Sequence, residues 1–555
     1  MHSTTNYNRI LQCLITITIV VTAVGLCFPI TSASFSPWYG SIAKNIALTN
    51  NWSDLVLSNH DWLDKPHFPF WATALSFKVF GINSFAYVLP GFLFHLIGAL
   101  YTYKLTKFLY QDKTTALVAS LIYLSVLHLM LSAIDVRAEA YLLGQIMPAV
   151  YYWLRYDQKF SLKYLFLGAL FTALALMTKG IFVIITIISG LVCLWVYSKR
   201  LWNLVHPKWL VALALSMLMT TPELIALYLQ FDAHPEKIIF GHTQVSGIRW
   251  FFIDSQFGRF FGTGPIVTTN PPPLHQLFFI HTFLWAFLPW SLVFPVAIYS
   301  ALRQFRHQAR QLRQNSILLL GYFFISFIMF SLTSFQVDHY TNIIFPFAAI
   351  LCAKFLVDSA TTAPKIYRVQ QWLSSLILII TASLVGMLFH GWILAIFVIL
   401  EVILVLILVR HWGQTPFIKA LLLSVSAICL LFVVAMTING YLYHKYDSGY
   451  LAAQVSNAQP QIPVVDYLFD SRALEFYSHN HYYKINDLNQ VTDLPQFYLV
   501  LPAPEWAKIR TNYPQAELIS AVQGNLPEKI IPHLANVQQL TNNLATIDII
   551  LMKRP

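Results

Sequence analysis

Long apolar runs alternate with short polar loops from about residue 10 to residue 441. The runs are about 20 residues long and show no strict alternation of apolar and polar positions, so they predict membrane-spanning helices rather than barrel strands. We expect about thirteen such helices, at residues 10–30, 84–103, 114–132, 139–154, 164–178, 181–198, 208–230, 276–300, 316–333, 340–358, 370–389, 391–409 and 420–441.

The first apolar run has two interpretations, a signal peptide or a retained span. It is long, and no clear small-x-small cleavage site followed by a soluble domain is evident in the sequence. We therefore expect it to be retained as the first span.

Composition and charge agree with a polytopic α-helical membrane protein. Hydrophobic residues make up 57% of the 555 residues and charged residues 11%, whereas a soluble protein carries roughly 25% charged residues. Basic residues gather in every second loop, which is the positive-inside pattern and places the N-terminus in the cytoplasm. The net charge of +11 then sets topology, and we expect no nucleic-acid partner. The loop positions are Lys104, Lys107 and Lys113, Arg155, Lys159 and Lys163, Lys199, Arg200 and Lys208, Arg303, Arg306, Arg310 and Arg313, Lys354, Lys365 and Arg368, and Arg410 and Lys419.

Two long loops and the tail lie on the outer side in this topology. The loops cover residues 32–83 and 231–275, and the segment Tyr39–Leu48 of the first has the apolar spacing of an interfacial helix. Residues 1–442 are thus expected to form the transmembrane domain. Residues 443–555, where long apolar runs stop, are expected to form a small periplasmic α/β domain.

Three short segments of the tail read as strands, with helical stretches between them. They are Val464–Phe469, Phe497–Leu501 and Ile547–Met552.

Several classes of site are not supported by the sequence. The five cysteines all lie in apolar runs without metal-ligand spacing, so we expect neither a disulfide framework nor a cysteine metal site. The chain lacks a P-loop, a GxSxG elbow, an HExxH motif and a dinucleotide fingerprint. A nucleotide-driven or zinc-protease function has no support.

Asp135 and Glu139 are the first candidate chemical groups, at the outer end of the third predicted span. Four residues apart, they share one face of a helix, and ionisable groups near membrane depth usually line a cavity. The alternative is a salt bridge with Arg137 that only caps a helix.

Lys65, next to Asp64 in the first loop, is the second candidate, because a lysine is a compact charge that suits a phosphate. The alternative is an interfacial lysine between the belt aromatics Trp62 and Trp71. Arg259 is a candidate second cation for that phosphate, and Lys179 is a weaker one. Both also fit ordinary contacts with lipid headgroups.

Asp338-His339-Tyr340 forms a polar patch between two spans. His339 is a candidate acid or base near neutral pH, although a lone histidine there is more often structural. Glu223 and Glu401 lie inside apolar runs and stay structural or unassigned.

The order of motifs in the first loop resembles the GT-C membrane glycosyltransferases that use polyprenyl-phosphate sugars. This family includes the aminoarabinose transferase of lipid A and the protein-mannosyltransferase-like group. The resemblance covers about the first 350 residues. The matching residues are Tyr39-Gly40-Ser41-Ile42, Asn50-Asn51-Trp52, Asp64-Lys65-Pro66, Trp71, Phe80-Gly81, Leu89-Pro90, Asp135, Lys179-Gly180, Arg259-Phe260, Pro289-Trp290, Tyr340 and Phe345-Pro346.

One position departs from the family pattern. The family has an acidic residue, the favoured base for the acceptor, four residues before the tyrosine, and this chain has Phe35 and Ser36 at that place. Three interpretations stay open. Asp135 or Glu139 carries the base role, Asp54 or Asp61 swings in from the same loop, or the acceptor needs little help and the chain has weak activity.

The resemblance implies an enzyme of the bacterial inner membrane that moves a sugar from a polyprenyl phosphate to a lipid, glycan or protein on the outer face, with inversion. Lipid A modification and protein glycosylation are both within this scope. It implies membrane lipids as partners, no cofactor and no required metal. The implied catalytic group is Asp135, Glu139 and Asp64, the donor-phosphate group is Lys65, Arg259 and Lys179, and the substrate cavity is Tyr39, Trp71, His67, Tyr340 and His339.

Two other functional classes compete with this one. A flippase or transporter for lipid-linked sugars needs polar residues near the bilayer midplane and often internal repeats, whereas this chain concentrates charge at the outer span ends. A non-catalytic protein that binds lipid phosphates is favoured by Phe35 in place of the family's acid.

Overall fold

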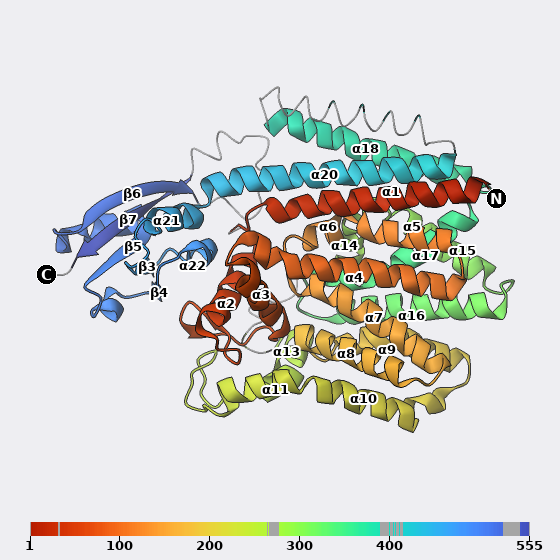
Figure 1. Ribbon diagram of the computed structural model, residues 1–555, viewed down its shortest axis with the longest axis horizontal. Coiled ribbons are helices and arrows are strands. Elements are labelled where there is room, and N and C mark those ends of the chain that lie inside the picture. The colour runs from red at the N-terminus through yellow and green to blue at the C-terminus, as the bar shows by residue number, and fades with distance from the viewer. Residues whose placement is uncertain are drawn as a thin grey trace.

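The protein is a bundle of helices with a β-sheet domain at one end (Figure 1). The computed structural model describes residues 2–31, 34–263, 277–388, 415–524 and 544–553, with a few isolated positions between them. The N-terminus lies at the end of the bundle opposite the sheet (Figure 1). The predicted class, a polytopic helical membrane protein with a C-terminal domain of mixed structure, is confirmed.

The bundle holds the described elements up to residue 446. Its main helices are α1 (His2–Val24), α2 (Ser36–Thr49), α3 (Phe68–Phe80), α4 (Ser84–Tyr110), α5 (Lys113–Leu124), α6 (Leu127–Ser132), α7 (Ala138–Gln158), α8 (Leu162–Lys179), α9 (Val183–Tyr197), α10 (Pro207–Met219), α11 (Thr221–Leu227), α12 (Gly247–Arg249), α13 (Ser255–Phe261), α14 (Phe278–Ala286), α15 (Val293–Gln304), α16 (Arg310–Leu332), α17 (Phe345–Asp358), α18 (Pro364–Leu388) and α20 (Pro416–Tyr446). Shorter turns of helix are η1 (Gly25–Cys27), η2 (Leu201–Val205), η3 (Tyr228–Asp232), η4 (Trp250–Asp254) and η6 (Asp338–Ile344), and a two-stranded hairpin pairs β1 (Val56–Leu57) with β2 (His60–Asp61).

Fewer helices meet the requirements for a membrane span than the thirteen predicted. By length and apolarity the described residues contain seven, or eight if the bent pair Pro207–Met219 and Thr221–Asp232 forms one span. Helices α5 and α9 are apolar but shorter than 18 residues. The predicted span 391–409 lies outside the described residues, apart from isolated positions. The other twelve are candidate spans, bent pairs or helices that fall short of the requirement.

Two further predicted spans are each broken into two helices, and their breaks meet. The run 114–132 divides into α5 and α6 around Ser125, and the run 276–300 divides into α14 and α15 around Pro289. The Trp290 indole N–H donates to Ser125 Oγ over 3.0 Å, and the Leu127 N–H donates to the Leu288 carbonyl over 3.1 Å. Because polar backbone in a membrane needs internal partners, each break supplies partners for the other.

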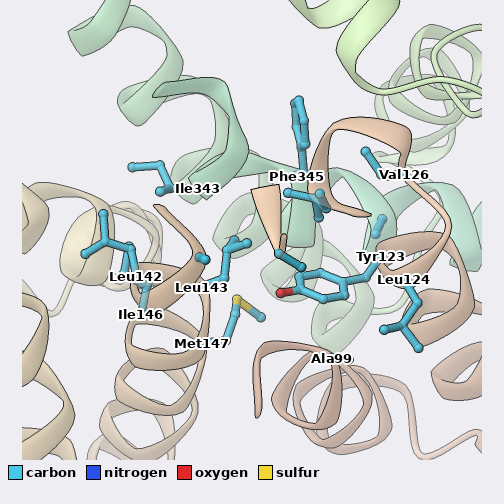
Figure 2. Packing of buried hydrophobic residues seen from close by; sticks show 14 of the residues in the cluster. Ala99, Tyr123, Leu124, Val126, Leu142, Leu143, Ile146, Met147, Ile343 and Phe345 are labelled. Carbon is cyan, nitrogen blue, oxygen red and sulfur yellow. The ribbon is translucent and has the colours of Figure 1, made fainter. Parts of the chain in front are cut away.

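The centre of the bundle is a continuous apolar core. Figure 2 shows Leu143 and Met147 of α7 on the side that faces Tyr123 of α5, and Leu142 and Ile146 on the opposite side of the helix. Leu124 of α5 and Ala99 of α4 belong to the same core. All of these side chains are at most 4% exposed. Helix α7 therefore fills the middle of the fold, and its first turn carries Glu139 to the end of the bundle that faces the sheet.

The C-terminal domain is a five-stranded mixed sheet in the order β4-β3-β5-β7-β6. Strands β4, β3 and β5 are parallel, and β7 pairs antiparallel with both β5 and β6. The three predicted strands are present, and β4 and β6 were not predicted. The strands are β3 (Val464–Tyr467), β4 (Tyr482–Ile485), β5 (Gln496–Pro502), β6 (Glu517–Gly524) and β7 (Ala545–Lys553), and the helices are α21 (Ser448–Ser456), α22 (Arg472–Tyr477) and α23 (Ala503–Ile509), with the turns η7 (Leu488–Val491) and η8 (Arg510–Asn512).

A buried lysine joins this domain to the first loop. Lys44 of α2 donates from Nζ to the carbonyls of Glu475, Phe476 and Ser478, over 2.7, 3.3 and 2.5 Å. In return, the Glu475 carboxylate accepts hydrogen bonds from the backbone N–H and the hydroxyl of Ser58. These contacts satisfy the carbonyls at the end of α22, which otherwise lack intrahelical partners. They fix α2 and the hairpin against the sheet domain.

Candidate functional site

Asp135 lies in the loop between α6 and α7, at the end of the bundle that faces the sheet domain. Its Oδ1 accepts a hydrogen bond from the Ser36 hydroxyl over 2.7 Å, and its Oδ2 lies 3.2 Å from a guanidinium nitrogen of Arg137. Burial raises the pKa of Asp135, but Arg137 and the hydroxyls of Ser34 and Ser36 outweigh it and hold the pKa below its usual value. Asp135 is therefore a carboxylate, and its side chain remains 40% exposed.

Phe35, which stands where the resembling family has its acid, holds cations instead. The guanidinium of Arg472 lies 4.4 Å from the centre of the Phe35 ring, and that of Arg137 lies 5.6 Å from it. An aromatic face attracts a cation at such distances. Phe35 is thus flanked by two positive charges. The Asp135 carboxylate is hydrogen-bonded to the next residue, Ser36.

Glu139, in the first turn of α7, is a buried carboxylate with an ion partner. Its Oε1 accepts a hydrogen bond from Lys179 Nζ over 2.5 Å. Lys179, at the C-terminus of α8, also lies 4.1 Å above the ring of Tyr340. Glu139 Oε2 is 3.8 Å from His339 Nε2 and has no hydrogen-bond partner among the described residues.

Lys65, Asp64 and Arg259 form a second ionic cluster. Asp64 Oδ2 accepts from Lys65 Nζ over 2.8 Å, and Asp64 Oδ1 pairs with Arg259 of α13. Burial, with Arg259 nearby, lowers the pKa of Lys65 to about 8 although the Asp64 carboxylate opposes this. Burial raises the pKa of Asp64, but Lys65 and Arg259 outweigh it and lower the pKa overall. One carboxylate therefore holds two cations together.

Two cavities meet at Glu139. The polar cavity has a volume of about 350 Å³, and its charged walls include Asp135, Arg137 and Glu139. The apolar cavity, of about 60 Å³, is lined mainly by hydrophobic side chains, with the cations Lys179 and Arg259 in its wall. His339 lines the polar cavity and Tyr340 the apolar cavity. The arrangement gives an apolar compartment with cations on one side of a carboxylate and a compartment rich in polar groups on the other.

His67 lies outside both cavities and is fully buried. Its ring Nδ1 is 2.9 Å from Glu223 Oε1, its backbone N–H donates to Glu223 Oε2 over 2.9 Å, and its Nε2 is 2.9 Å from the Ser53 carbonyl. Burial lowers the pKa of His67, but Glu223 and the Ser53 carbonyl outweigh it and raise the pKa overall. The pair ties the loop that carries Lys65 to α11.

Two aromatic candidates, Trp71 and Tyr39, pack within the first loop and its helices. Trp71 donates its indole N–H to the Trp52 carbonyl over 2.7 Å and does not line either cavity. The Tyr39 ring packs edge-on against Phe70 and Trp62, with centroid distances of 5.3 and 6.5 Å. Burial, with Asp64 and Glu139 nearby, raises the pKa of Tyr39 well above its usual value, so its hydroxyl stays protonated.

The alternative acids of the first loop lie away from both cavities. Asp54 is held within its own turn by Asn51 and Ser53. Asp61 is paired with Lys237 over 3.0 Å and accepts from Gln230 over 2.9 Å. Within the part of the chain that the structure describes, no cluster of three or more histidine, cysteine or acidic side chains has the arrangement of a metal site.

Four features of the site were not predicted. They are the Ser36–Asp135 hydrogen bond, the Glu223–His67 pair, the Lys44 contacts and the place of His128, which lines the polar cavity with its Nδ1 2.6 Å from Asn342 Oδ1. Each involves a polar residue within an otherwise apolar or helical run. That signal marks a buried partner but does not identify it.

Comparison with known proteins agrees with the resemblance seen in the sequence. The family model described as dolichyl-phosphate-mannose-protein mannosyltransferase matches residues 64–225. The chain is 24% identical over 327 residues to undecaprenyl phosphate-alpha-4-amino-4-deoxy-L-arabinose arabinosyl transferase 2 of Proteus mirabilis, covering 58% of this chain and 55% of the relative. It is 23% identical over 362 residues to the corresponding transferase of an Enterobacter species, covering 64% and 60%.

The chain therefore matches somewhat less than two thirds of the length of these relatives. An uncharacterized protein of Aquifex aeolicus is 24% identical over 319 residues, with 58% of each chain covered.

The fold as a whole matches a solved structure over nearly its full length. The crystal structure of ArnT from Cupriavidus metallidurans bound to undecaprenyl phosphate superposes with a TM-score of 0.72, at 16% identity and with 97% of both chains covered. The same protein in the apo state gives a TM-score of 0.71 at 14% identity. The chain is thus a multi-pass membrane protein with an ArnT-like fold.

Proposed function

We propose that this protein transfers a sugar from a polyprenyl-phosphate donor to an acceptor hydroxyl or amine. The observation that carries the proposal is the pair of cavities that share Glu139, with Lys179 and Arg259 on one side and Asp135 on the other. A lipid-linked sugar needs an apolar compartment for the chain, cations for the phosphate and a polar compartment for the sugar and acceptor. The similarity to transferases named for undecaprenyl-phosphate sugars supports this assignment.

In this mechanism, Lys179 and Arg259 bind the donor phosphate at the wall of the apolar cavity. Asp64 pairs with both Lys65 and Arg259 in this structure. Lys65 reaches the same phosphate when its ion pair with Asp64 is replaced by one with the phosphate. Preorganised cations stabilise the negative charge that develops on a leaving phosphate. Asp64 has the role of a counter-ion that positions the two cations before the donor arrives.

Asp135 acts as the base for the acceptor. It is ionised, and it lines the polar cavity. Its hydrogen bond to Ser36 holds it next to residue 35, the position at which the family that this chain resembles carries an acid. Glu139 is less suited because its Oε1 is already bonded to Lys179. It instead orients Lys179 and, through its unpartnered Oε2, a hydroxyl of the donor sugar.

The reaction is a single displacement. The acceptor oxygen or nitrogen forms a bond to the anomeric carbon, the bond from that carbon to the phosphate oxygen breaks, and the electron pair leaves with the polyprenyl phosphate. Asp135 takes the acceptor proton and returns it to solvent through the polar cavity. Attack opposite the leaving group inverts the anomeric centre.

The orientation follows the positive-inside pattern. The site and the C-terminal domain are proposed to face the periplasm of a bacterial inner membrane, and residues 1–442 and 443–555 are proposed as the two domains. We also propose that α7, α9 and the broken pairs α5–α6 and α14–α15 cross the bilayer, beyond the seven or eight helices that qualify by length and apolarity.

The test is transfer by the reconstituted protein with undecaprenyl-phosphate sugars and a panel of lipid, glycan and peptide acceptors. We expect transfer by the wild type and strong losses in Asp135→Asn and Lys65→Ala. Asp54→Asn, a carboxylate of the first loop that is held by Asn51 and Ser53 and belongs to neither ionic cluster, is the matched control and should retain activity. Full activity in both site variants would falsify the residue assignment.

A second candidate function is binding of a lipid phosphate without chemistry. Phe35 at the family's acid position favours it, because that place carries cations rather than a base. Undecaprenyl-phosphate binding without transfer, over the whole acceptor panel, would favour this function.

A further inference from the structure

A third cavity, separate from the proposed donor site, lies between the first loop and the C-terminal domain. This interdomain cleft has a volume of about 410 Å³. One wall is formed by Trp38 of α2 and by His60, Asp61 and Trp62 of the hairpin region. The facing wall is formed by Asp470, Lys484 and Asn486 of the sheet domain. Cavities of about 300–1,000 Å³ typically hold small ligands.

The aromatic wall of the cleft offers two indole surfaces beside polar groups, and the guanidinium of Arg472 lies 5.0 Å from the ring of one of them, Trp38. Trp38 and Trp62 are both half-buried and meet edge to face, with ring centroids 6.4 Å apart. A sugar ring presents C–H bonds on its faces and hydroxyls around its edge, so it packs its face on an indole and needs hydrogen-bond partners at its rim. The Asn486 side chain is exposed and makes no hydrogen bond within the described residues. It is thus available as both donor and acceptor.

The charged groups of the cleft are paired, which argues against an ionic ligand. Asp61 is paired with Lys237, and Asp470 is paired with Lys484. A paired carboxylate keeps lone pairs for hydroxyl donors but offers little net attraction to an ion. Two indoles, an unpaired amide and neutralised charges together match a neutral sugar better than a phosphate or a cationic peptide.

The cleft is connected to both halves of the proposed site through the chain itself. Trp38 follows Ser36, the partner of Asp135, by two residues, and Trp62 precedes Asp64 by two residues. The Trp62 ring also packs edge-on against Tyr39. A ligand in the cleft therefore contacts the same two segments that position the base and the phosphate cations.

We infer that the interdomain cleft binds a neutral sugar ring of the acceptor, which makes the acceptor a glycan or glycolipid. This inference rests on the proposed transfer function, since it assigns the acceptor class of that reaction. The indoles of Trp38 and Trp62 form the platform, and Asn486 with the free lone pairs of Asp61 and Asp470 contacts the hydroxyls. The C-terminal domain supplies half of the acceptor site.

The direct test is saturation-transfer NMR on the full chain in lipid nanodiscs. The probes are di- and trisaccharides of glucose, galactose, mannose and N-acetylglucosamine, with peptides of similar mass as the comparison. We expect saturation transfer to at least one saccharide, and weaker binding by about 10-fold, which corresponds to about 1.4 kcal/mol, in Trp38→Leu and in Asn486→Ala. Asn489→Ala, an exposed asparagine three residues from Asn486 and outside the cleft, should bind as the wild type does.

The outcomes separate this inference from the proposed function. No saccharide binding, equal binding by wild type and cleft variants, or binding of the peptides instead overturns the inference, even if sugar transfer occurs. Saccharide binding that the cleft variants lose, without transfer to any acceptor, overturns the proposed function and leaves the cleft a sugar-binding site. Where transfer occurs, the cleft variants should raise the acceptor KM with kcat and the undecaprenyl-phosphate affinity unchanged.

Discussion

The Ser36 hydroxyl donates to Asp135 Oδ1 over 2.7 Å, although the two residues are 99 positions apart in the chain. The contact brings a carboxylate from the loop before α7 next to the segment where the resembling family carries its own acid. In the proposed mechanism, Asp135 takes the role of that acid from a different element. This relationship decides which variants best test the site.

Adding an acid at residue 35 should rescue the loss of Asp135. Asp135→Asn removes the base, and general-base catalysis contributes about 10²–10⁴-fold. In that background, Phe35→Asp restores a carboxylate next to Ser36 and should recover about 10-fold or more of the lost rate. The measurement is kcat for sugar transfer. Phe35→Asn in the same background is the control, and equal rates for the two double variants would contradict the prediction.

Binding of the donor phosphate should weaken as the pH rises through 8. Lys65, with a pKa of about 8, is largely ammonium at pH 7 and loses its proton above pH 8. At pH 9 about a tenth of it remains charged, so the affinity for undecaprenyl phosphate should fall by about 10-fold. Lys65→Arg stays charged over this range and should flatten the profile. A profile of the same slope in both proteins would assign the change to another group.

The buried pair of His67 and Glu223 should contribute to stability far more than an exposed pair. His67→Ala leaves the Glu223 carboxylate buried without its partner, which costs about 3–5 kcal/mol. We expect a lower melting temperature and faster proteolysis of the first loop. His234→Ala, which removes the exposed His234–Glu236 pair, is the matched control and should leave both unchanged. Similar melting of the two variants would argue against this role.

Loss of Lys44 should loosen the contact between α2 and the sheet domain. Hydrogen bonds to a charged group contribute about 1.5–3 kcal/mol, so Lys44→Met should speed amide exchange at residues 472–478 by about 10-fold or more. Lys78→Met, a change of the same type at an exposed lysine bonded to Asn50, should not. Unchanged exchange in the Lys44 variant would show that other contacts hold the domain.

The sheet domain should be less stable at neutral pH than at pH 5. Burial raises the pKa of Asp466 from 3.8 to about 6, although the Tyr482 hydroxyl and the backbone N–H groups of Asp470 and Phe469 oppose this. The folded state holds a proton that the unfolded state releases, so the stabilisation is complete below about pH 4 and is lost as the pH rises through 6. The difference between pH 5 and pH 7 amounts to about 1.3 kcal/mol, out of about 3 kcal/mol over the whole titration. Asp466→Asn should reduce the pH dependence of the melting temperature, and an unaltered dependence would contradict the assignment.

The sequence predicted the class of fold and singled out several candidate site residues because those signals are local. Apolar runs indicated a helical membrane protein, and the short segment from Asp64 to Pro66 indicated a charged cluster, in which Asp64 pairs with both Lys65 and Arg259. The breaks at Ser125 and Pro289 were not predicted, since a broken helix keeps the same apolar composition as a continuous one.

The remaining part of the site depends on contacts between distant residues. Glu223 was left unassigned because nothing in an apolar run indicates that its partner is His67, 156 residues earlier in the chain. Strand β4 was missed because its four residues, Tyr482–Ile485, owe their place to pairing with β3 rather than to a strong pattern of their own.

The reciprocal hydrogen bonds between the first loop and α22 have a practical consequence for engineering. The first loop and the sheet domain supply each other's hydrogen-bond partners. Lys44 and Ser58 of the first loop contact residues 475–478 of the sheet domain. In a chimera whose sheet domain lacks these carbonyls, Lys44 would be buried without hydrogen-bond partners. A new sheet domain should therefore be grafted together with the segment of the first loop that carries Lys44 and Ser58.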